Sequence, residues 1–134
     1  MTDENARTNV AAEVARGQEA LRAAEALLAL ALFHDALSRA YYAASHYARA
    51  LLLTEGIDPK SRTGVGRMLG MHFVVPGRIA AERAKDLARL EQFRNEADYN
   101  RFFVLTHEGA AEELAVAVRF CDELRRWLTT HGWI

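Results

Sequence analysis

The chain has 134 residues and a formal net charge of −1 at pH 7. This length is enough for one domain with a buried core, residues 1–134, and leaves no room for a second. The charge excludes binding to nucleic acid through an overall basic field, so any such site must be a local patch. Fifteen of the 17 basic residues are arginine, which favours paired hydrogen bonds to carboxylates or phosphates.

The composition gives no sign of a metal, a cofactor or a membrane anchor. Cys121 is the single cysteine and has apolar neighbours, so we expect a buried thiol. No carboxylate–histidine cluster has the spacing of metal ligands. The first residues are acidic rather than signal-like, and the longest apolar run, Ala26 to Phe33, is too short to span a bilayer. We therefore expect a cytoplasmic protein without cofactor or metal.

Helical periodicity runs through nearly the whole chain, and the two prolines mark breaks. In the first segment apolar residues recur at spacings of three, four and seven. Gly56 supplies a left-handed end to the second segment, and Thr106 is the predicted cap of the last. The predicted helices span about Asp3–Ala31, His34–Thr54, Thr63–His72 (short), Ile79–Tyr99 and Thr106–Thr130.

Four long helices joined by short connections predict an all-α fold. We expect an antiparallel four-helix up-and-down bundle with one additional short helix. Gly17 lies inside the first helix and should weaken it locally.

The second predicted helix has two distinct faces. Its apolar face comprises Leu37, Ala40, Tyr41, Ala44, Ala48 and Leu51. The opposite face comprises Arg39, Tyr42, His46, Arg49 and Leu53, and no acidic residue occurs between Asp35 and Glu55. Such a face suits a partner helix or a phosphate with a stacked base. The alternative is a solvated face whose arginines extend into water.

The third long helix carries an arginine at the edge of its apolar stripe. Leu87, Leu90, Arg94 and Asp98 share one flank. Arg94 and Asp98 are one turn apart and can pair, but an isolated pair in this order stabilises a helix by only a few tenths of a kcal/mol. A half-buried guanidinium needs an anionic partner. We expect that partner to be either Asp98 or the phosphate of a ligand.

Several stretches together resemble the HEPN family, and in particular its stand-alone members, often encoded beside a minimal nucleotidyltransferase. They are Asp35–Ala44, Ala50–Gly56, Thr63–Val65 with His72–Val74, and Arg94-Asn95-Glu96-Ala97-Asp98-Tyr99. The resemblance implies a helical bundle that forms a homodimer, with the signature motifs of the two subunits meeting in a shared cleft. It also implies RNA cleavage without metal and a toxin whose antitoxin is the nucleotidyltransferase.

The resemblance gives Arg94 the role of the motif arginine and Asn95 that of the polar residue after it. An arginine stabilises charge on a phosphorane, and a histidine five to seven positions later would move the proton of the 2′-hydroxyl. Here Tyr99 stands where that histidine begins to be expected. The other candidate proton carriers are His46 and, with Arg101, His107.

Three functions remain open at this stage. The first is a metal-independent ribonuclease toxin centred on Arg94, with Asn95, Asp98 and Tyr99 around it. The second is a dimeric module without catalysis that binds RNA or nucleotide phosphate through Arg94 and the Arg39–Tyr42–His46 face, or holds a nucleotidyltransferase that modifies Tyr99. The third is a structural helical adaptor in which Arg94 and Asp98 are only an internal pair.

Overall fold

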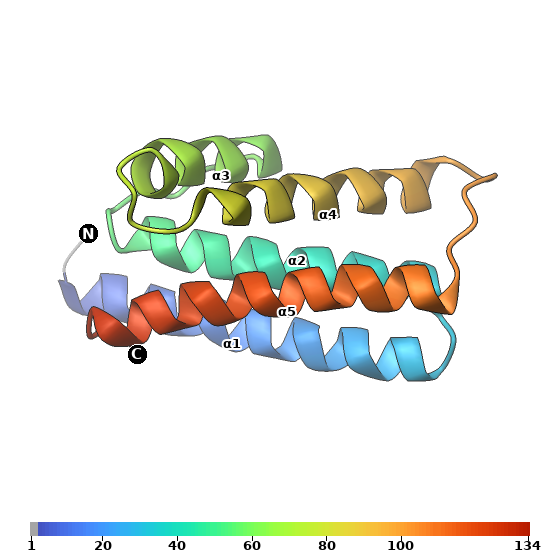
Figure 1. The fold of residues 1–134 in the computed structure, drawn as a ribbon. Helices are drawn as coiled ribbons and strands as arrows, with labels where there is room; N and C mark the ends of the chain where they lie inside the picture. Colours follow the sequence, from blue (N-terminus) through green and yellow to red (C-terminus); the bar gives the residue numbers. More distant parts are fainter. Residues whose placement is uncertain (1–2) are drawn as a thin grey trace.

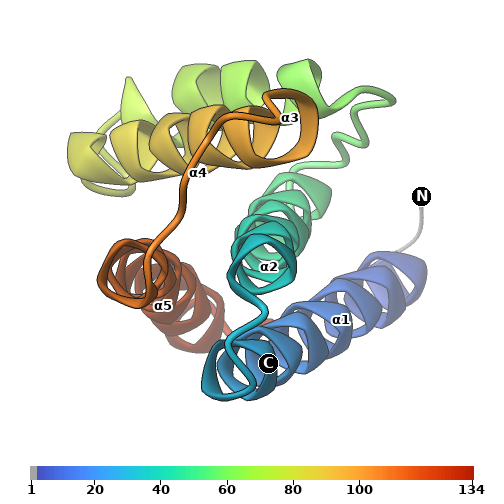
Figure 2. The same ribbon diagram turned by 90° about the vertical axis from the view of Figure 1, so that its right-hand side faces the viewer.

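The computed structural model describes residues 3–134 and shows them as a bundle of helices without strands (Figure 1). In chain order the elements are α1 (Asp3–Ala29), α2 (Phe33–Leu53), α3 (Arg62–Leu69), the π-helical turn η1 (Gly70–Val74), α4 (Ala81–Tyr99) and α5 (His107–Thr130). The four long helices run alternately in opposite directions, and α3 lies beside the start of α4 (Figures 1 and 2). The predicted antiparallel four-helix bundle with one short extra helix is confirmed.

Two of the predicted helix-end signals, the Thr106 cap and Gly56, are found in the structure. The Thr106 hydroxyl accepts a hydrogen bond from the backbone N–H of Gly109 at 3.0 Å, which caps α5. Gly56 follows α2 with a φ of +73°, the left-handed conformation that a glycine adopts without strain.

Three predicted bounds differ from the structure by two residues or more. The first helix ends at Ala29, because Ala31 has a φ of +61° and the chain turns there. The short helix ends at Leu69 and continues as the wider π-turn η1 rather than stopping at His72. The fourth begins at Ala81, after an extended residue 80, instead of at Ile79.

Helix α2 is the centre of the bundle. It packs against α1, α3, α4 and α5, and Figure 2 shows it in the middle of them. Alanines dominate its buried surface, and small side chains allow neighbouring helices to approach closely. All six residues of its predicted apolar face are buried: Leu37, Ala40, Tyr41, Ala44, Ala48 and Leu51.

Gly17 is a point where α1 packs directly against a side chain of α2. A Cβ atom at this position would lie 2.7 Å from two ring carbons of Tyr47, whose side chain is buried. The glycine that was expected only to weaken α1 therefore has a packing role, because no other residue leaves room for this ring.

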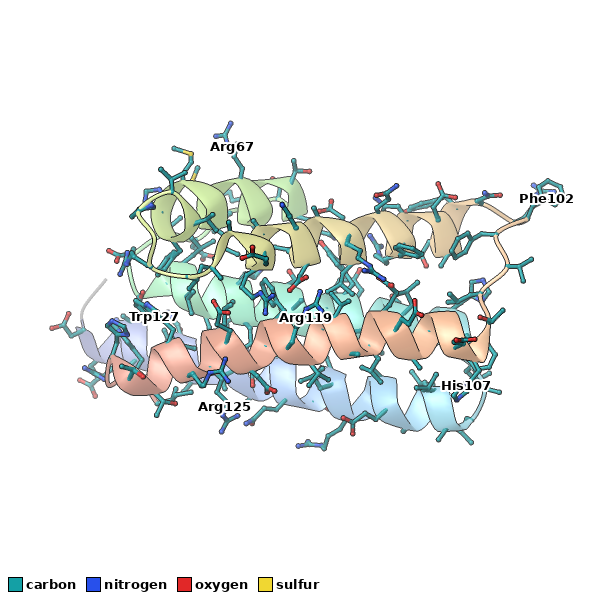
Figure 3. All side chains as sticks on the ribbon, viewed as in Figure 1. Arg67, Phe102, His107, Arg119, Arg125 and Trp127 are labelled. Atoms are coloured by element: carbon teal, nitrogen blue, oxygen red, sulfur yellow. The ribbon has the colours of Figure 1, made fainter. Side chains whose placement is uncertain are left out.

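Helix α4 is fixed to α5 mainly by ion pairs. Buried Asp86 accepts hydrogen bonds from Arg119 of α5, the shorter at 2.7 Å, and its other neighbour, Arg83, lies 3.0 Å away. Buried Glu113 of α5 in turn accepts three hydrogen bonds from Arg89, with 2.5 Å between the closest atoms. Figure 3 shows Arg119 in the seam between these two helices. The pairs set the position of α4, the helix that carries Arg94.

One smaller expectation, the burial of Cys121, has an outcome. Cys121 is buried, as expected, and burial raises the pKa of its thiol well above the ordinary value. None of the helices formed by residues 3–134 is both long and apolar enough to cross a membrane.

The Gly17 contact predicts opposite effects for the same substitution at two helical glycines. Gly17→Ala should lower the free energy of unfolding by about 1–3 kcal/mol, because the new methyl group overlaps the buried Tyr47 ring. Gly66→Ala is the control, since its Cβ would meet only Leu87 at 4.0 Å. It should raise the stability by about 0.5–1 kcal/mol through helix propensity. Urea denaturation of both variants measures this, and equal effects would contradict the packing role.

Candidate functional site

Arg94 is almost completely buried on the inner side of α4. Its residue exposure is 7%, and it lies one turn beyond Leu90 on the face that α4 turns toward α2. The guanidinium carbon is 5.5 Å from the ring centre of Tyr41 and 5.4 Å from that of Tyr42. The faces of these rings attract a cation and shield it from water. The guanidinium group of Arg94 therefore lies against two tyrosine rings of α2.

The polar contacts of Arg94 leave its Nε, a buried donor, without a hydrogen bond, as is also true of Nε of Arg83 beside Asp86. Oδ2 of Asp98 is 3.1 Å from Nε, and Oδ1 of Asn95 accepts a hydrogen bond from Nη1 at 3.3 Å. Nε is fully shielded from solvent, yet no residue in the range 3–134 lies along its N–H direction to accept a hydrogen bond. The Asp98 contact is therefore an attraction between charges without a formed hydrogen bond.

Two further arginines complete the site. Arg39 of α2 and Arg62 of α3 place their guanidinium carbons 4.8 and 5.5 Å from the centre of the Tyr42 ring. No carboxylate of the described chain lies within 4 Å of either guanidinium. Three helices thus bring three cations to one phenol. We call Arg39, Tyr41, Tyr42, Arg62 and Arg94 the tyrosine–arginine cluster.

The charges around Tyr41 show which acid lies near the cluster. The pKa of the Tyr41 hydroxyl is raised, first by burial and then by the carboxylate of Glu91. Arg62 and Arg94 act on the same pKa in the opposite direction. The cluster therefore has three arginines against two carboxylates, Glu91 and Asp98, and it is a local positive site on a chain of net charge −1.

The predicted motif residues do not all gather around Arg94. Asn95 and Asp98 contact it, as described above. Tyr99 does not, because α4 remains regular to its last residue and the phenol points away, with 79% of its surface exposed. The alternative pair, Arg101 and His107, forms no hydrogen bond with Arg94 in the described structure, and the centre of the His107 ring lies 5.7 Å from that of Phe33 in an edge-to-face arrangement.

The polar face predicted on α2 separates into three environments. Arg39 and Tyr42 join Arg94, whereas His46 turns to α1, where its Nδ1 lies 2.7 Å from Oε2 of Glu13. Arg49 donates a hydrogen bond to the carbonyl oxygen of Pro59 at 2.7 Å. Leu53 was expected on this face but is buried in the core. The reason is that α2 is covered on more sides than a surface helix.

Arg62 is the site residue that the sequence did not reveal. It is the first residue of a short helix and has no motif around it, while its partner Tyr42 lies twenty positions earlier. Only the packing of α3 on α2 brings the two together. Within residues 3–134, no three histidine, cysteine, aspartate or glutamate side chains are grouped as metal ligands would be.

Comparison with known proteins points to one family. Residues 12–127 match the family described as the HEPN domain. A Methanocaldococcus jannaschii protein with the name "putative toxin" is 34% identical over 128 residues, which cover 96% of this chain and 95% of that protein. A second protein of the same name and organism is 27% identical over 115 residues, 86% of this chain and 78% of its own. A UPF0332 protein of Pyrococcus horikoshii is 49% identical over 70 residues, 52% of this chain and 49% of its own.

The unsatisfied Nε predicts that Arg94 contributes little to stability. Arg94→Met should change the free energy of unfolding by no more than about 1 kcal/mol, because methionine fills similar space and Asp98 remains partly solvated. Asp86→Ala is the contrast. It should cost about 2–3 kcal/mol, since it removes the hydrogen bonds that join α4 to Arg119 of α5 and leaves Arg83, which is largely buried, with only the more distant Glu123. Chemical denaturation tests both, and a loss at Arg94 as large as that at Asp86 would assign Arg94 a structural role.

Proposed function

This chain belongs to the HEPN family, and we propose that it is a toxin that binds RNA through phosphate groups at the tyrosine–arginine cluster. The observation that carries the proposal is the buried guanidinium of Arg94, whose Nε has no hydrogen-bond acceptor. The names of its relatives support the toxin role.

A phosphate fits the cluster better than a base does. The guanidinium groups of Arg39, Arg62 and Arg94 lie over the Tyr42 ring, where a base would otherwise stack. Guanidinium groups bind phosphate oxygens through paired, charge-assisted hydrogen bonds. Of the two ligand parts considered from the sequence, the phosphate is therefore the one we propose for this site.

The proposed partner is a minimal nucleotidyltransferase that acts as the antitoxin. Tyr99 is exposed at the last turn of α4, and its hydroxyl makes no hydrogen bond to another residue of the described part. A transferase can reach such a hydroxyl. Attachment of a nucleotide five residues after Arg94 would add negative charge near the cluster and oppose the binding of RNA.

We also propose that the protein works as a homodimer. Large apolar side chains are exposed at one end of the bundle, where α1 turns into α2 and α4 into α5 (Figures 1 and 2): Leu30, Leu32, Tyr99, Phe102 and Val104. Figure 3 shows Phe102 projecting beyond this end. Such a group is typical of an interface. The motif of α4 ends here, so pairing at this end would bring two motifs together.

The alternative is a dimeric helical adaptor without catalysis. Two observations favour it: no histidine follows Arg94 at the motif spacing, and Asp98 already lies against the guanidinium. Under this alternative the cluster would show no preference for RNA over an uncharged ligand.

RNA binding should depend on Arg94 and not on arginine in general. Arg94→Met should weaken the binding of a fluorescent single-stranded RNA, followed by anisotropy in EDTA, by about tenfold or more, because charge-assisted hydrogen bonds are lost. The control is Arg67→Met, because Arg67 is exposed and points away from the bundle (Figure 3). Equal affinity of the two variants would contradict the proposed site.

The dimer should depend on the apolar end of the bundle. Phe102→Asp combined with Val104→Asp should convert the dimer to a monomer in size-exclusion chromatography with light scattering, because charges would replace the apolar contact. Val75→Asp is the control, since Val75 is equally exposed (83%) in the segment between η1 and α4, at the opposite end. A dimer that survives the double substitution would place the interface elsewhere.

A further inference from the structure

The pair of Arg94 and Asp98 is the reverse of a pair that fixes α4 to α5. Where Arg89 binds Glu113, the carboxylate is buried, with 2% of its side chain exposed, and the arginine is 43% exposed. At the tyrosine–arginine cluster the side chain of Arg94 is only 8% exposed, and that of Asp98 is 33% exposed. Glu113 also accepts three hydrogen bonds from its arginine, whereas Asp98 accepts none from Nε of Arg94. Asp98 is therefore the member of its pair that can leave.

Resting on the proposed binding of a phosphate at this cluster, we propose that Asp98 is an internal competitor for that phosphate. In the free protein its carboxylate occupies the edge of Arg94 that the ligand binds, and so it holds the site closed. A phosphate that takes this edge displaces Asp98 and opens the last turn of α4. The last turn is therefore a small lid whose state depends on which anion Arg94 holds.

The competition follows from the two edges of the guanidinium group. An arginine binds an oxygen anion most firmly through two parallel N–H bonds. Arg89 and Arg119 both use Nε and Nη2 in this way, each for one carboxylate. On Arg94 the same edge is the one at which Oδ2 of Asp98 lies, 3.1 Å from Nε. The other edge is already engaged, because Nη1 donates a hydrogen bond to Asn95.

The burial of Arg94 makes the opening an exchange of anions. A cation that is shielded from water is strongly unfavourable without a counter-charge. The carboxylate of Asp98 therefore leaves only when another anion replaces it. The rings of Tyr41 and Tyr42 belong to α2, so they remain beside the guanidinium when α4 loses its last turn.

The last turn of α4 is also the part of this helix that is least suited to a carboxylate. Residues 96–99 include Glu96 and Asp98 and no basic residue. The free carbonyl groups at the C-terminus of a helix carry partial negative charge and repel such side chains. Arg94 is the last of the buried residues of α4. Once a ligand replaces Asp98 at Arg94, the attraction that offsets this repulsion is lost, and the turn unwinds more easily.

The opening would extend to the apolar end of the bundle. The backbone N–H of Asn100 donates a hydrogen bond to the carbonyl oxygen of Glu96 at 3.0 Å. The side-chain oxygen of Asn100 accepts one from the backbone N–H of Phe102 at 3.1 Å. Because these bonds depend on the last turn, Phe102 would move when the turn opens. The anion bound at Arg94 would thus change the surface that we propose for pairing.

The first test compares two variants that each remove one negative charge from the last turn of α4. Asp98→Asn should tighten the binding of a fluorescent single-stranded RNA by about tenfold, because asparagine fills the same space without the competing charge. Glu96→Gln is the control, since Glu96 accepts a hydrogen bond from Asn100 and does not contact Arg94. It should bind RNA within about twofold of wild type. Anisotropy measures both affinities, and equal values would reject the competition.

Hydrogen exchange distinguishes a displaced Asp98 from the mere removal of a repelling charge. When RNA binds to the wild-type protein, the backbone amides of residues 97–102 should exchange about tenfold faster, because the last turn opens. Residues 85–92, in the middle of α4, are the internal control and should not change. Mass spectrometry of proteolytic peptides measures the exchange. Binding without faster exchange in the last turn would reject the displacement, whatever the affinities are.

The outcomes separate this inference from the proposed function. If wild type binds RNA, Arg94→Met weakens the binding and Asp98→Asn leaves it unchanged, the competition is rejected and the phosphate site stands. If Asp98→Asn binds RNA where wild type does not, the competition is supported in its strongest form. If neither protein binds RNA, the proposed function is overturned, and this inference with it.

Discussion

The fold depends on how closely α1 and α5 can approach α2. The alanines of α2 and the glycine beneath Tyr47 allow these helices to pack with little space between their backbones. As a result α2 is covered on most of its circumference, and a narrow strip carrying Arg39, Tyr42 and His46 remains available at the surface. The candidate site is therefore built on the part of the central helix that packing leaves uncovered.

Helix positions were predictable because local signals determine them. Each of these signals involves residues that lie within one or two helical turns of one another. They are the spacing of apolar residues, the Thr106 cap and Gly56. The position of α4 was not predictable in this way. Its inner face begins at Asp86 and ends at Arg94, with only Leu87 and Leu90 buried between them. The charges that fix it have partners more than twenty residues away, and sequence spacing carries no information about such pairs.

The site was predicted in part for the same reason. Two partners for Arg94 were predicted from the sequence, Asp98 and the phosphate of a ligand. In the structure Oδ2 of Asp98 lies 3.1 Å from Nε of Arg94 but accepts no hydrogen bond from it. Arg39 and Tyr42 were identified because they share a face of one helix. Arg62 was not, because it reaches α2 from another helix. Side chains contributed across helices become visible only when the helices are packed.

The ion pairs between α4 and α5 also select one alignment of these two helices. If α4 moved by one turn along α5, Asp86 and Glu113 would be enclosed opposite the wrong side chains, and a buried carboxylate without its cation is strongly unfavourable. An apolar seam would allow such sliding more readily, since leucine contacts are not directional. The position of the last two turns of α4 along the bundle is therefore specified by ion pairs elsewhere along the helix, and mutations of those pairs can displace Arg94 without contacting it.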